Sequence, residues 1–188
     1  LKDLSKSSEN KYFIMRHGQT NHNLEGLWSC DSHVDDPLTP EGKLQVQKTA
    51  EGLKSKNIDI IICSPFPRTQ QSAHEVAMVL GYDKEAIIAD KRLGEWNIGK
   101  EYDQRPYNEF FAIRNVAPDR YNFKIGDSES YADVITRAGE FIYDIEQRYK
   151  GKNILIITHG GVTRSIELVT KGFSYDSLHA DTRDYPNF

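Results

Sequence analysis

The stretch Tyr12-Phe13-Ile14-Met15-Arg16-His17-Gly18 places an apolar run directly before an arginine, a histidine and a glycine. Two more apolar runs, Ile58–Cys63 and Ile154–Thr158, occur further along the chain. Runs such as Ile60-Ile61-Ile62 are continuous rather than alternating, which is typical of strands that are covered on both faces. The first run, Tyr12–Met15, and its two counterparts therefore predict buried strands.

Between and after these strands, apolar residues recur at helical spacing. Thr39 can cap one helix, in which Val46, Ala50 and Leu53 share a face. Three more helices are predicted: about 68–80 ended by Gly81, from Ser130 to an end at Gly151, and about 162–170 ended by Gly172. Strands that alternate with helices predict an α/β fold, here a three-layer α/β/α sandwich with a mainly parallel central sheet.

The stretch from about 100 to 127 interrupts this alternation with two prolines, a glycine and many aromatic residues. We expect one domain over residues 1–188, with this stretch as an excursion on the rim of the sheet and a short helix around 107–114. Its side chains allow two interpretations. One is a lid that stacks on a sugar, base or aromatic ring while an arginine takes a second negative charge, and the other is a satellite core that pins a long loop. The side chains concerned are Tyr102, Arg105, Tyr107, Phe110, Phe111, Arg114, Arg120 and Tyr121, flanked by Trp28 and Trp96.

Composition restricts the class of protein. The 188 residues are 38% hydrophobic and 28% charged, as in soluble globular domains, and no apolar run approaches the roughly 20 residues of a membrane-spanning helix. A net charge of −4 argues against a general nucleic-acid surface. The polar start lacks the apolar segment of a secretory signal, but the chain does not begin with Met, so a natural start could have been trimmed. We expect a cytoplasmic protein without nucleic-acid or membrane partners, and the oligomeric state stays open.

The cysteine and aspartate pattern does not indicate a metal site. Cys30 and Cys63 form no Cys-x-x-Cys pair, and two free thiols are a simpler interpretation than one disulfide. Asp35 and Asp36 fit a turn or the approach to a helix better than a metal site. We therefore expect no metal and no cofactor.

Ligands of open α/β sheets bind outside the carboxyl ends of the strands, so the residues that follow each strand are candidates for the site. These residues are Arg16-His17-Gly18, the stretch 64–68 that ends in Arg68, and His159-Gly160-Gly161. Arginine forks suit the oxygens of a phosphoryl group, and glycines let backbone N–H groups approach a ligand. Two arginines and two histidines at one rim of an acidic protein predict a phosphate site.

The same residues belong to a series of motifs that resembles the histidine phosphatase superfamily, the group that includes cofactor-dependent phosphoglycerate mutases. The resemblance runs in order from about Tyr12 to Asn187, nearly the whole chain. Its motifs are Arg16-His17-Gly18-Gln19-Thr20 with Asn23, Asp36-Pro37-Leu38-Thr39-Pro40-Glu41-Gly42, Ser64-Pro65 with Arg68-Thr69 and Ala73, Leu93-Gly94-Glu95 with Gly99, Gly126-Asp127-Ser128-Glu129-Ser130, and Thr158-His159-Gly160-Gly161.

The resemblance implies a role for each matching residue. His17 is the nucleophile that takes the phosphoryl group, and Glu95 donates a proton to the leaving oxygen and then activates water. Arg16, Arg68 and His159 bind the phosphoryl oxygens. The substrate also meets Gly18, Asn23 and Gly160. The physical chemistry agrees, because nearby cations hold an imidazole neutral and can supply the electrostatic stabilisation that phosphoryl transfer needs without a metal.

The resemblance leaves the reaction partly open. The span from Glu95 to Glu129 is comparatively short and lacks the insertion and basic pair of the family's mutases, so we favour a phosphatase that acts on a small phosphorylated metabolite. The alternatives are a cofactor-dependent phosphoglycerate mutase, and a regulatory phosphoprotein phosphatase or binding module on the same fold. Gln19 stands where relatives often carry Glu. The chain stops at Pro186-Asn187-Phe188, where relatives continue into a last strand, so we expect a truncated chain or a sheet without that strand.

Overall fold

The central sheet has four parallel strands in the order β1-β4-β2-β3, in a computed structural model that describes residues 8–172. The strands are β1 Lys11–Arg16, β2 Ile60–Cys63, β3 Ile88–Ala89 and β4 Asn153–Thr158. The register aligns the carboxyl ends of the three predicted strands, because Arg16 pairs with Thr158 and Ile157 pairs with Cys63. The expectation of a mainly parallel sheet is confirmed, and the segments that follow these strands start side by side.

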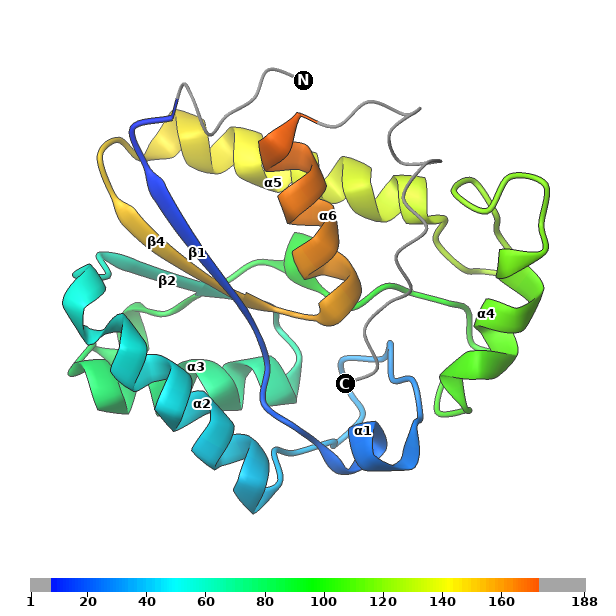
Figure 1. Cartoon of the computed structure of the whole chain (residues 1–188), viewed down its shortest axis with the longest axis horizontal. Coiled ribbons are helices and arrows are strands. Elements are labelled where there is room, and N and C mark those ends of the chain that lie inside the picture. The colour runs from blue at the N-terminus through cyan, green and yellow to red at the C-terminus, as the bar shows by residue number, and fades with distance from the viewer. Residues whose placement is uncertain (1–7, 173–188) are drawn as a thin grey trace.

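Helices cover both faces of this sheet and form the outer layers of the predicted sandwich (Figure 1). Helices α2 Pro40–Leu53 and α3 Pro67–Leu80 lie on one face, and α5 Tyr131–Arg148 and α6 Gly160–Lys171 lie on the other. Alternate residues of each strand point to opposite faces of the sheet. Ile61 and Leu155 join the core under α2 and α3, whereas Ile62 and Ile156 join the core under α5 and α6. Both faces are therefore buried, which explains the continuous apolar runs in the sequence.

The ends of the helices follow the expected capping signals in most places. The Thr39 hydroxyl accepts a hydrogen bond from the Gly42 N–H, and Gly81 and Gly172 end their helices in the left-handed conformation. Helix α5 ends at Arg148 rather than at Gly151. Its next residue, Tyr149, takes an extended backbone and packs against the core.

Two other boundaries and one strand differ from the sequence-based expectation. Strand β2 begins at Ile60 rather than at Ile58, and α6 begins at Gly160 rather than near Val162. The two-residue strand β3 has no signal of its own, since a segment this short shows no period. The expectation that the last strand of the sheet is truncated or missing concerns residues that lie outside the described range. Three short 3-10 helices complete this part of the described chain, at Lys54–Lys56, Lys84–Ala86 and Lys91–Leu93.

The excursion at 100–127 carries the predicted short helix, α4 Tyr107–Asn115. Most of its aromatic side chains pack around Trp96, which is fully buried together with Phe110, and they extend the core under α5 and α6. We call this aromatic extension the satellite core. Arg114 is buried as well, with its guanidinium over the rings of Trp96, Tyr121 and Tyr131. Arg114 therefore belongs to the satellite core.

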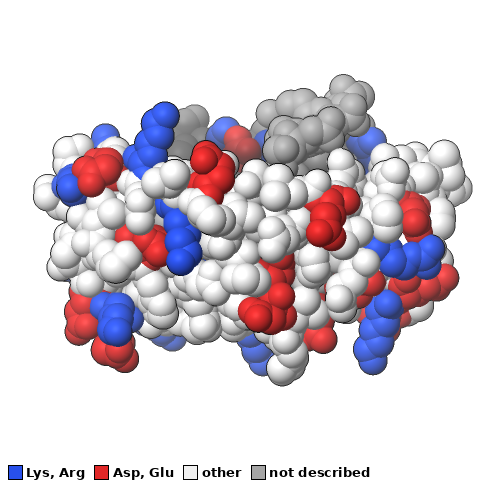
Figure 2. All heavy atoms as spheres, turned by 90° about the horizontal axis from the view of Figure 1, so that it is seen from below, with Lys and Arg blue, Asp and Glu red and all other residues white. Residues whose placement is uncertain are grey.

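The surface carries charges of both signs. On the face in Figure 2, Lys and Arg side chains are interspersed with Asp and Glu and form no continuous basic patch. Within residues 8–172, no helix combines the length and the apolar character that crossing a membrane requires. Cys30 and Cys63 are both free thiols.

Candidate active site

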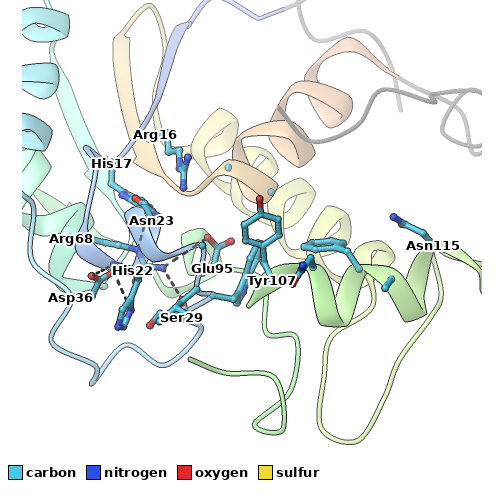
Figure 3. Close-up of a pocket in the computed structure, with 18 residues that line it drawn as sticks. Arg16, His17, His22, Asn23, Ser29, Asp36, Arg68, Glu95, Tyr107 and Asn115 are labelled. Carbon is cyan, nitrogen blue, oxygen red and sulfur yellow. Dashed lines mark hydrogen bonds and ion pairs between the residues drawn. The ribbon is translucent and has the colours of Figure 1, made fainter. Parts of the chain in front are cut away.

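A cavity of about 400 Å³ opens at the carboxyl ends of the strands. Its wall combines the end of β1, the short helix α1 Asn21–Glu25 with the loop after it, the start of α3, and one face of α4 (Figure 3). Six of the predicted site residues line it: Arg16, His17, Asn23, Arg68, Glu95 and Gly160. The parallel sheet thus brings residues from distant parts of the sequence into one cavity.

His17 is placed by the sheet and is held in one tautomer. Its backbone N–H donates to the Thr158 carbonyl at 3.0 Å and continues the pairing of β1 with β4. Its Nδ1 lies 2.8 Å from the Gly18 carbonyl, which can only accept, so Nδ1 carries the proton and Nε2 carries the lone pair. The Nε–H group of Arg68 donates to that Nε2 at 3.2 Å. Burial, helped by the charges of Arg68 and Arg16, holds the pKa of His17 well below 6.5, so the imidazole is neutral and nucleophilic.

Arg68 lies in the first turn of α3 and is almost fully buried. Its Nη2 donates to the Ser29 carbonyl at 2.8 Å, and its guanidinium carbon lies 4.8 Å from the centre of the Phe66 ring. Its Nη1 is buried and has no hydrogen-bond partner within the described residues. A buried cation with an unused donor at the cavity wall fits a site that is completed by an anion.

His159 lies directly beneath this wall and is fully buried. Its Nε2 lies 2.8 Å from the Ser64 hydroxyl, and its ring centre lies 5.2 Å from that of His17. Its Nδ1 has no hydrogen-bond partner in residues 8–172 and lies 3.5 Å from the Glu95 carboxylate. Burial and the charge of Arg68 hold the pKa of His159 well below 6.5. The ring thus offers a second nitrogen for a ligand on the Glu95 side.

Glu95 and Arg16 supply the opposite charges of the site. One Glu95 oxygen accepts from the Trp96 N–H at 2.8 Å, and the other lies 3.9 Å from Nη2 of Arg68. Burial raises the pKa of Glu95, although Arg68 and the Trp96 N–H act in the opposite direction. Burial also lowers the pKa of Arg16 to about 10, with Glu95 opposing and Arg68 adding to this effect. Arg16 therefore stays charged near neutral pH, and Glu95 holds its proton more readily than an exposed glutamate.

The segment that carries Glu95 is fixed by hydrogen bonds from two neighbouring elements. Arg137 of α5 donates to the Glu95 carbonyl at 3.2 Å and forms an ion pair with Glu129 at 2.9 Å. The Thr158 hydroxyl donates to the Leu93 carbonyl at 2.6 Å from the end of β4. These contacts hold the carboxylate in place beside His159.

The other predicted residues have local structural functions. Asn23 lines the cavity, but its Oδ1 also accepts from the Thr20 N–H in the capping box of α1. Gly18 does not line the cavity. A Cβ at Gly18 would lie 2.3 Å from the Gly42 carbonyl, so the loop needs glycine to pack against α2. Gly160 lies at the cavity wall, and the roles of all three in substrate binding stay predictions.

Several residues of the cavity carry only a weak signal in the sequence, or none. His22 and Asp36 both line it, and His22 Nδ1 lies 3.5 Å from a buried Asp36 oxygen. Asp36 also accepts a hydrogen bond from the His22 N–H at 3.2 Å. This aspartate was expected only in a turn or before a helix, and here it also fixes α1. The spacing of His22 from His17 gave a weak signal. Tyr107 and Phe111 of α4 stand among the aromatic residues that the sequence offers for stacking, whereas Asn108, Ala112 and Asn115 carry no signal, since one helix face inside an irregular excursion is not visible in the sequence.

The described residues 8–172 contain no group of three or more His, Cys, Asp or Glu side chains that could hold a metal ion. What they bring together is a neutral imidazole, the buried Arg68, the half-buried Arg16 and a carboxyl group whose pKa is raised. This combination can bind a dianion, attack it with nitrogen and donate a proton to a leaving oxygen.

Comparisons with known proteins identify the family to which the chain is similar. The family model described as "Histidine phosphatase superfamily (branch 1)" matches residues 12–181. A putative phosphoserine phosphatase 2 of Hydrogenobacter thermophilus is 25% identical over 172 residues, which is 89% of this chain and 82% of that protein. Phosphoglycerate mutase-like protein 4 of Arabidopsis thaliana is 31% identical over 160 residues, which is 81% of this chain and 67% of that protein.

A solved structure has the same fold. It is a mycobacterial glucosyl-3-phosphoglycerate phosphatase in a complex with VO3, and it superposes with a TM-score of 0.74 at 19% identity. The superposition covers 89% of this chain and 84% of that one. It confirms the three-layer fold that the alternating strands and helices predict.

Proposed function

The chain belongs to the histidine phosphatase superfamily, and on this premise we propose that it is a metal-independent phosphomonoester hydrolase that forms a phosphohistidine on His17. One observation carries the proposal. The proton on Nδ1 of His17 is held by the Gly18 carbonyl, so the Nε2 lone pair faces the buried guanidinium of Arg68. A phosphoryl group that binds to Arg68 is then placed beside a neutral nucleophile.

In the first step, Nε2 of His17 attacks phosphorus and the bond from phosphorus to the ester oxygen breaks. Glu95, with its raised pKa, donates its proton to that oxygen, and the alcohol leaves. The resulting phosphohistidine keeps its Nδ1 proton, and the Gly18 carbonyl at 2.8 Å stabilises the positive charge on the ring.

In the second step, water attacks phosphorus and Glu95 takes one of its protons. The bond from phosphorus to Nε2 breaks, inorganic phosphate leaves, and both His17 and Glu95 return to their starting forms. Arg16, Arg68 and His159 hold the phosphoryl oxygens through both steps, with Asn23 and the backbone at Gly18 and Gly160 as further contacts. The support for Arg68 and His159 is that each has a buried nitrogen without a hydrogen-bond partner in residues 8–172.

The alternative reaction is the transfer of a phosphoryl group within phosphoglycerate, since the relative in Arabidopsis thaliana is named a phosphoglycerate mutase-like protein. A mutase has the same phosphohistidine but returns the phosphoryl group to the organic product. Conversion of 3-phosphoglycerate into 2-phosphoglycerate well above the rate of phosphate release would replace the hydrolase by the mutase.

The test is the hydrolysis of para-nitrophenyl phosphate in excess chelator. We expect the parent protein to release phosphate and His17→Ala to lose activity on the order of 10⁴-fold or more, as when a nucleophile is removed. The matched control is His74→Ala, because His74 is exposed on α3 and does not line the cavity. Acid-labile phosphate on the parent protein but not on His17→Ala identifies the intermediate. Loss of activity in chelator contradicts the metal-independent reaction.

A further inference from the structure

The cavity has a second part, beyond the phosphoryl site, with a different chemical character. Figure 3 shows it extending from the cluster around His17 and Arg68 past Tyr107 toward Asn115. Helix α4 contributes two aromatic rings, two carboxamides and one methyl group to this part, and Trp28 also lines the cavity. The α4 residues are Tyr107, Asn108, Phe111, Ala112 and Asn115.

This part of the wall is fixed by backbone hydrogen bonds. The Trp28 N–H donates to the Arg105 carbonyl at 2.9 Å, and the Trp28 carbonyl accepts from Gln104 at 2.7 Å. The Tyr107 N–H donates to the Gly26 carbonyl at 3.1 Å. The loop after α1 and the start of α4 therefore form one continuous wall. These hydrogen bonds tie the aromatic surface to the folded frame.

The rings of this wall are also held in place. The Trp28 indole donates from Nε1 to the Trp96 carbonyl at 2.9 Å, and its ring centre lies 5.6 Å from that of Phe111. At the far end, Oδ1 of Asn115 accepts from Arg114 at 3.2 Å. This contact leaves the Nδ2 group of Asn115 to donate to a ligand.

The described wall of this part offers no cation to a second anionic group. Of the charged residues in 8–172 that line the cavity, Arg16, Arg68 and Glu95 belong to the phosphoryl site, and Asp36 faces His22. The arginines of the excursion are used elsewhere. Arg105 forms an ion pair with Glu109, Arg114 lies over the rings of the satellite core, and the guanidinium carbon of Arg120 lies 5.3 Å from the centre of the Tyr121 ring. None of the three lines the cavity. A carboxylate on the substrate would lose water here without gaining a positive partner within this wall.

We propose that this part of the cavity, which we call the neutral subsite, binds an uncharged ring-shaped alcohol, so that the substrate is the phosphate monoester of a sugar or nucleoside. The inference rests on the proposed hydrolase function and adds the substrate class to it. The rings of Trp28, Tyr107 and Phe111 offer stacking surface, and the amides of Asn108 and Asn115 offer hydrogen bonds to hydroxyl or heterocyclic groups. A monoester that carries a carboxylate gains less, because the neutral subsite gives it no ion pair.

The test compares phosphate esters on the parent protein and their binding to His17→Ala. Glucose 6-phosphate and uridine 5′-monophosphate represent the two neutral classes, and 3-phosphoglycerate represents the carboxylated class. We expect kcat/KM and affinity to be about tenfold higher for at least one neutral ester than for 3-phosphoglycerate, the effect of one missing ion pair. Which neutral ester is preferred separates a sugar from a nucleoside substrate.

A variant that adds a positive charge to the neutral subsite tests whether the lack of a cation there determines the preference. Asn115→Lys places a cation in the neutral subsite, and we expect it to reduce the preference against 3-phosphoglycerate by about tenfold. The matched control is Val116→Lys, because Val116 is the adjacent residue, is 82% exposed and does not line the cavity. It adds the same charge outside the subsite and should leave the preference unchanged.

The outcomes separate this inference from the proposed function. Tighter binding and faster hydrolysis of 3-phosphoglycerate than of both neutral esters overturns the neutral subsite and leaves the hydrolase intact. An equal response to both lysine variants also overturns it. If the parent hydrolyses no ester but His17→Ala still binds a neutral ester more tightly, the hydrolase fails and the neutral subsite stands.

Discussion

The two ends of the cavity differ in how they are built. The phosphoryl site comes from strand ends and helix starts, its His17, Arg68 and His159 are buried, and Arg68 lies 3.9 Å from the Glu95 carboxyl group. The neutral subsite comes from one short helix and one loop, and Asn108 and Asn115 in it are exposed. A site at strand ends is positioned by the whole sheet, whereas the subsite depends on local contacts. We therefore expect changes at the first end to affect the chemical step and changes at the second end to affect the choice of substrate.

Among the variants that test this difference between the two ends, we expect the largest loss of activity for Glu95→Gln. It removes the proton donor, and we expect kcat/KM, which reports the steps up to formation of the phosphohistidine, to fall by about 10³-fold for alkyl phosphates. The loss should be smaller for para-nitrophenyl phosphate, because its leaving group needs no proton. Glu109→Gln is the matched control, since Glu109 lies on α4 and pairs only with Arg105 in residues 8–172. Equal losses with both leaving groups would contradict the role of Glu95 as the acid.

The dependence of activity on pH tests the same roles of His17 and Glu95. The pKa of His17 lies below 6.5, so acid inactivates the parent only when the pH falls well below 6.5 and the imidazole gains a proton. The pKa of Glu95 is raised, so the alkaline decline begins above the range of an ordinary glutamate, where the carboxyl group loses its proton. In Glu95→Gln the acid limb should persist and the alkaline limb should disappear.

A medium effect is expected for Ser64→Ala, which tests whether burial alone positions the phosphoryl site. Ser64 is fully buried, and its hydroxyl lies 2.8 Å from Nε2 of His159. Without it, the buried ring nitrogen loses its partner, and we expect kcat to fall by about tenfold and the free energy of unfolding to fall by roughly 1–3 kcal/mol. Steady-state kinetics and thermal unfolding measure the two effects.

The matched control for that variant is Ser165→Ala. Ser165 is also fully buried, and its hydroxyl donates to the Gly161 carbonyl at 3.0 Å, within α6. It should lower stability but leave kcat near the parent value. A similar loss of kcat in both variants would mean that the site responds to general destabilisation and not to the orientation of His159.

The smallest effect is expected at the other end, for Phe111→Ala. Removing one stacking ring from the neutral subsite should lower kcat/KM for a ring-shaped ester by about fivefold, mainly through KM. The same variant should hydrolyse methyl phosphate as the parent does, because this substrate does not reach α4. Ile113→Ala is the control, since Ile113 lies on the same helix, is 42% exposed and does not line the cavity. An equal loss for methyl phosphate would break the contrast between the two ends.

The contrast also explains what could be predicted from the sequence. The residues around His17, Arg68 and His159 follow strands with a clear apolar pattern, and the sheet rule then places them together. The excursion has no such rule. Its aromatic residues look alike in the sequence, yet Phe110 is buried in the satellite core while its neighbour Phe111 faces the cavity. The rotation of α4 about its own axis determines which of the two rings faces the cavity, and that rotation depends on contacts with distant segments.

The hydrogen bond from Arg68 to Nε2 of His17 has a consequence for selectivity toward other reagents. Without an anion, the lone pair of the imidazole is covered by a guanidinium group, so soft electrophiles and metal cations meet a positive charge before they meet the nitrogen. A phosphate ester carries the charge that attracts the guanidinium to its own oxygens, and it uncovers the nitrogen as it binds. Acylation of His17 by diethyl pyrocarbonate should therefore be slow in the anion-free protein, and the nucleophile becomes reactive chiefly toward the class of molecule that unmasks it.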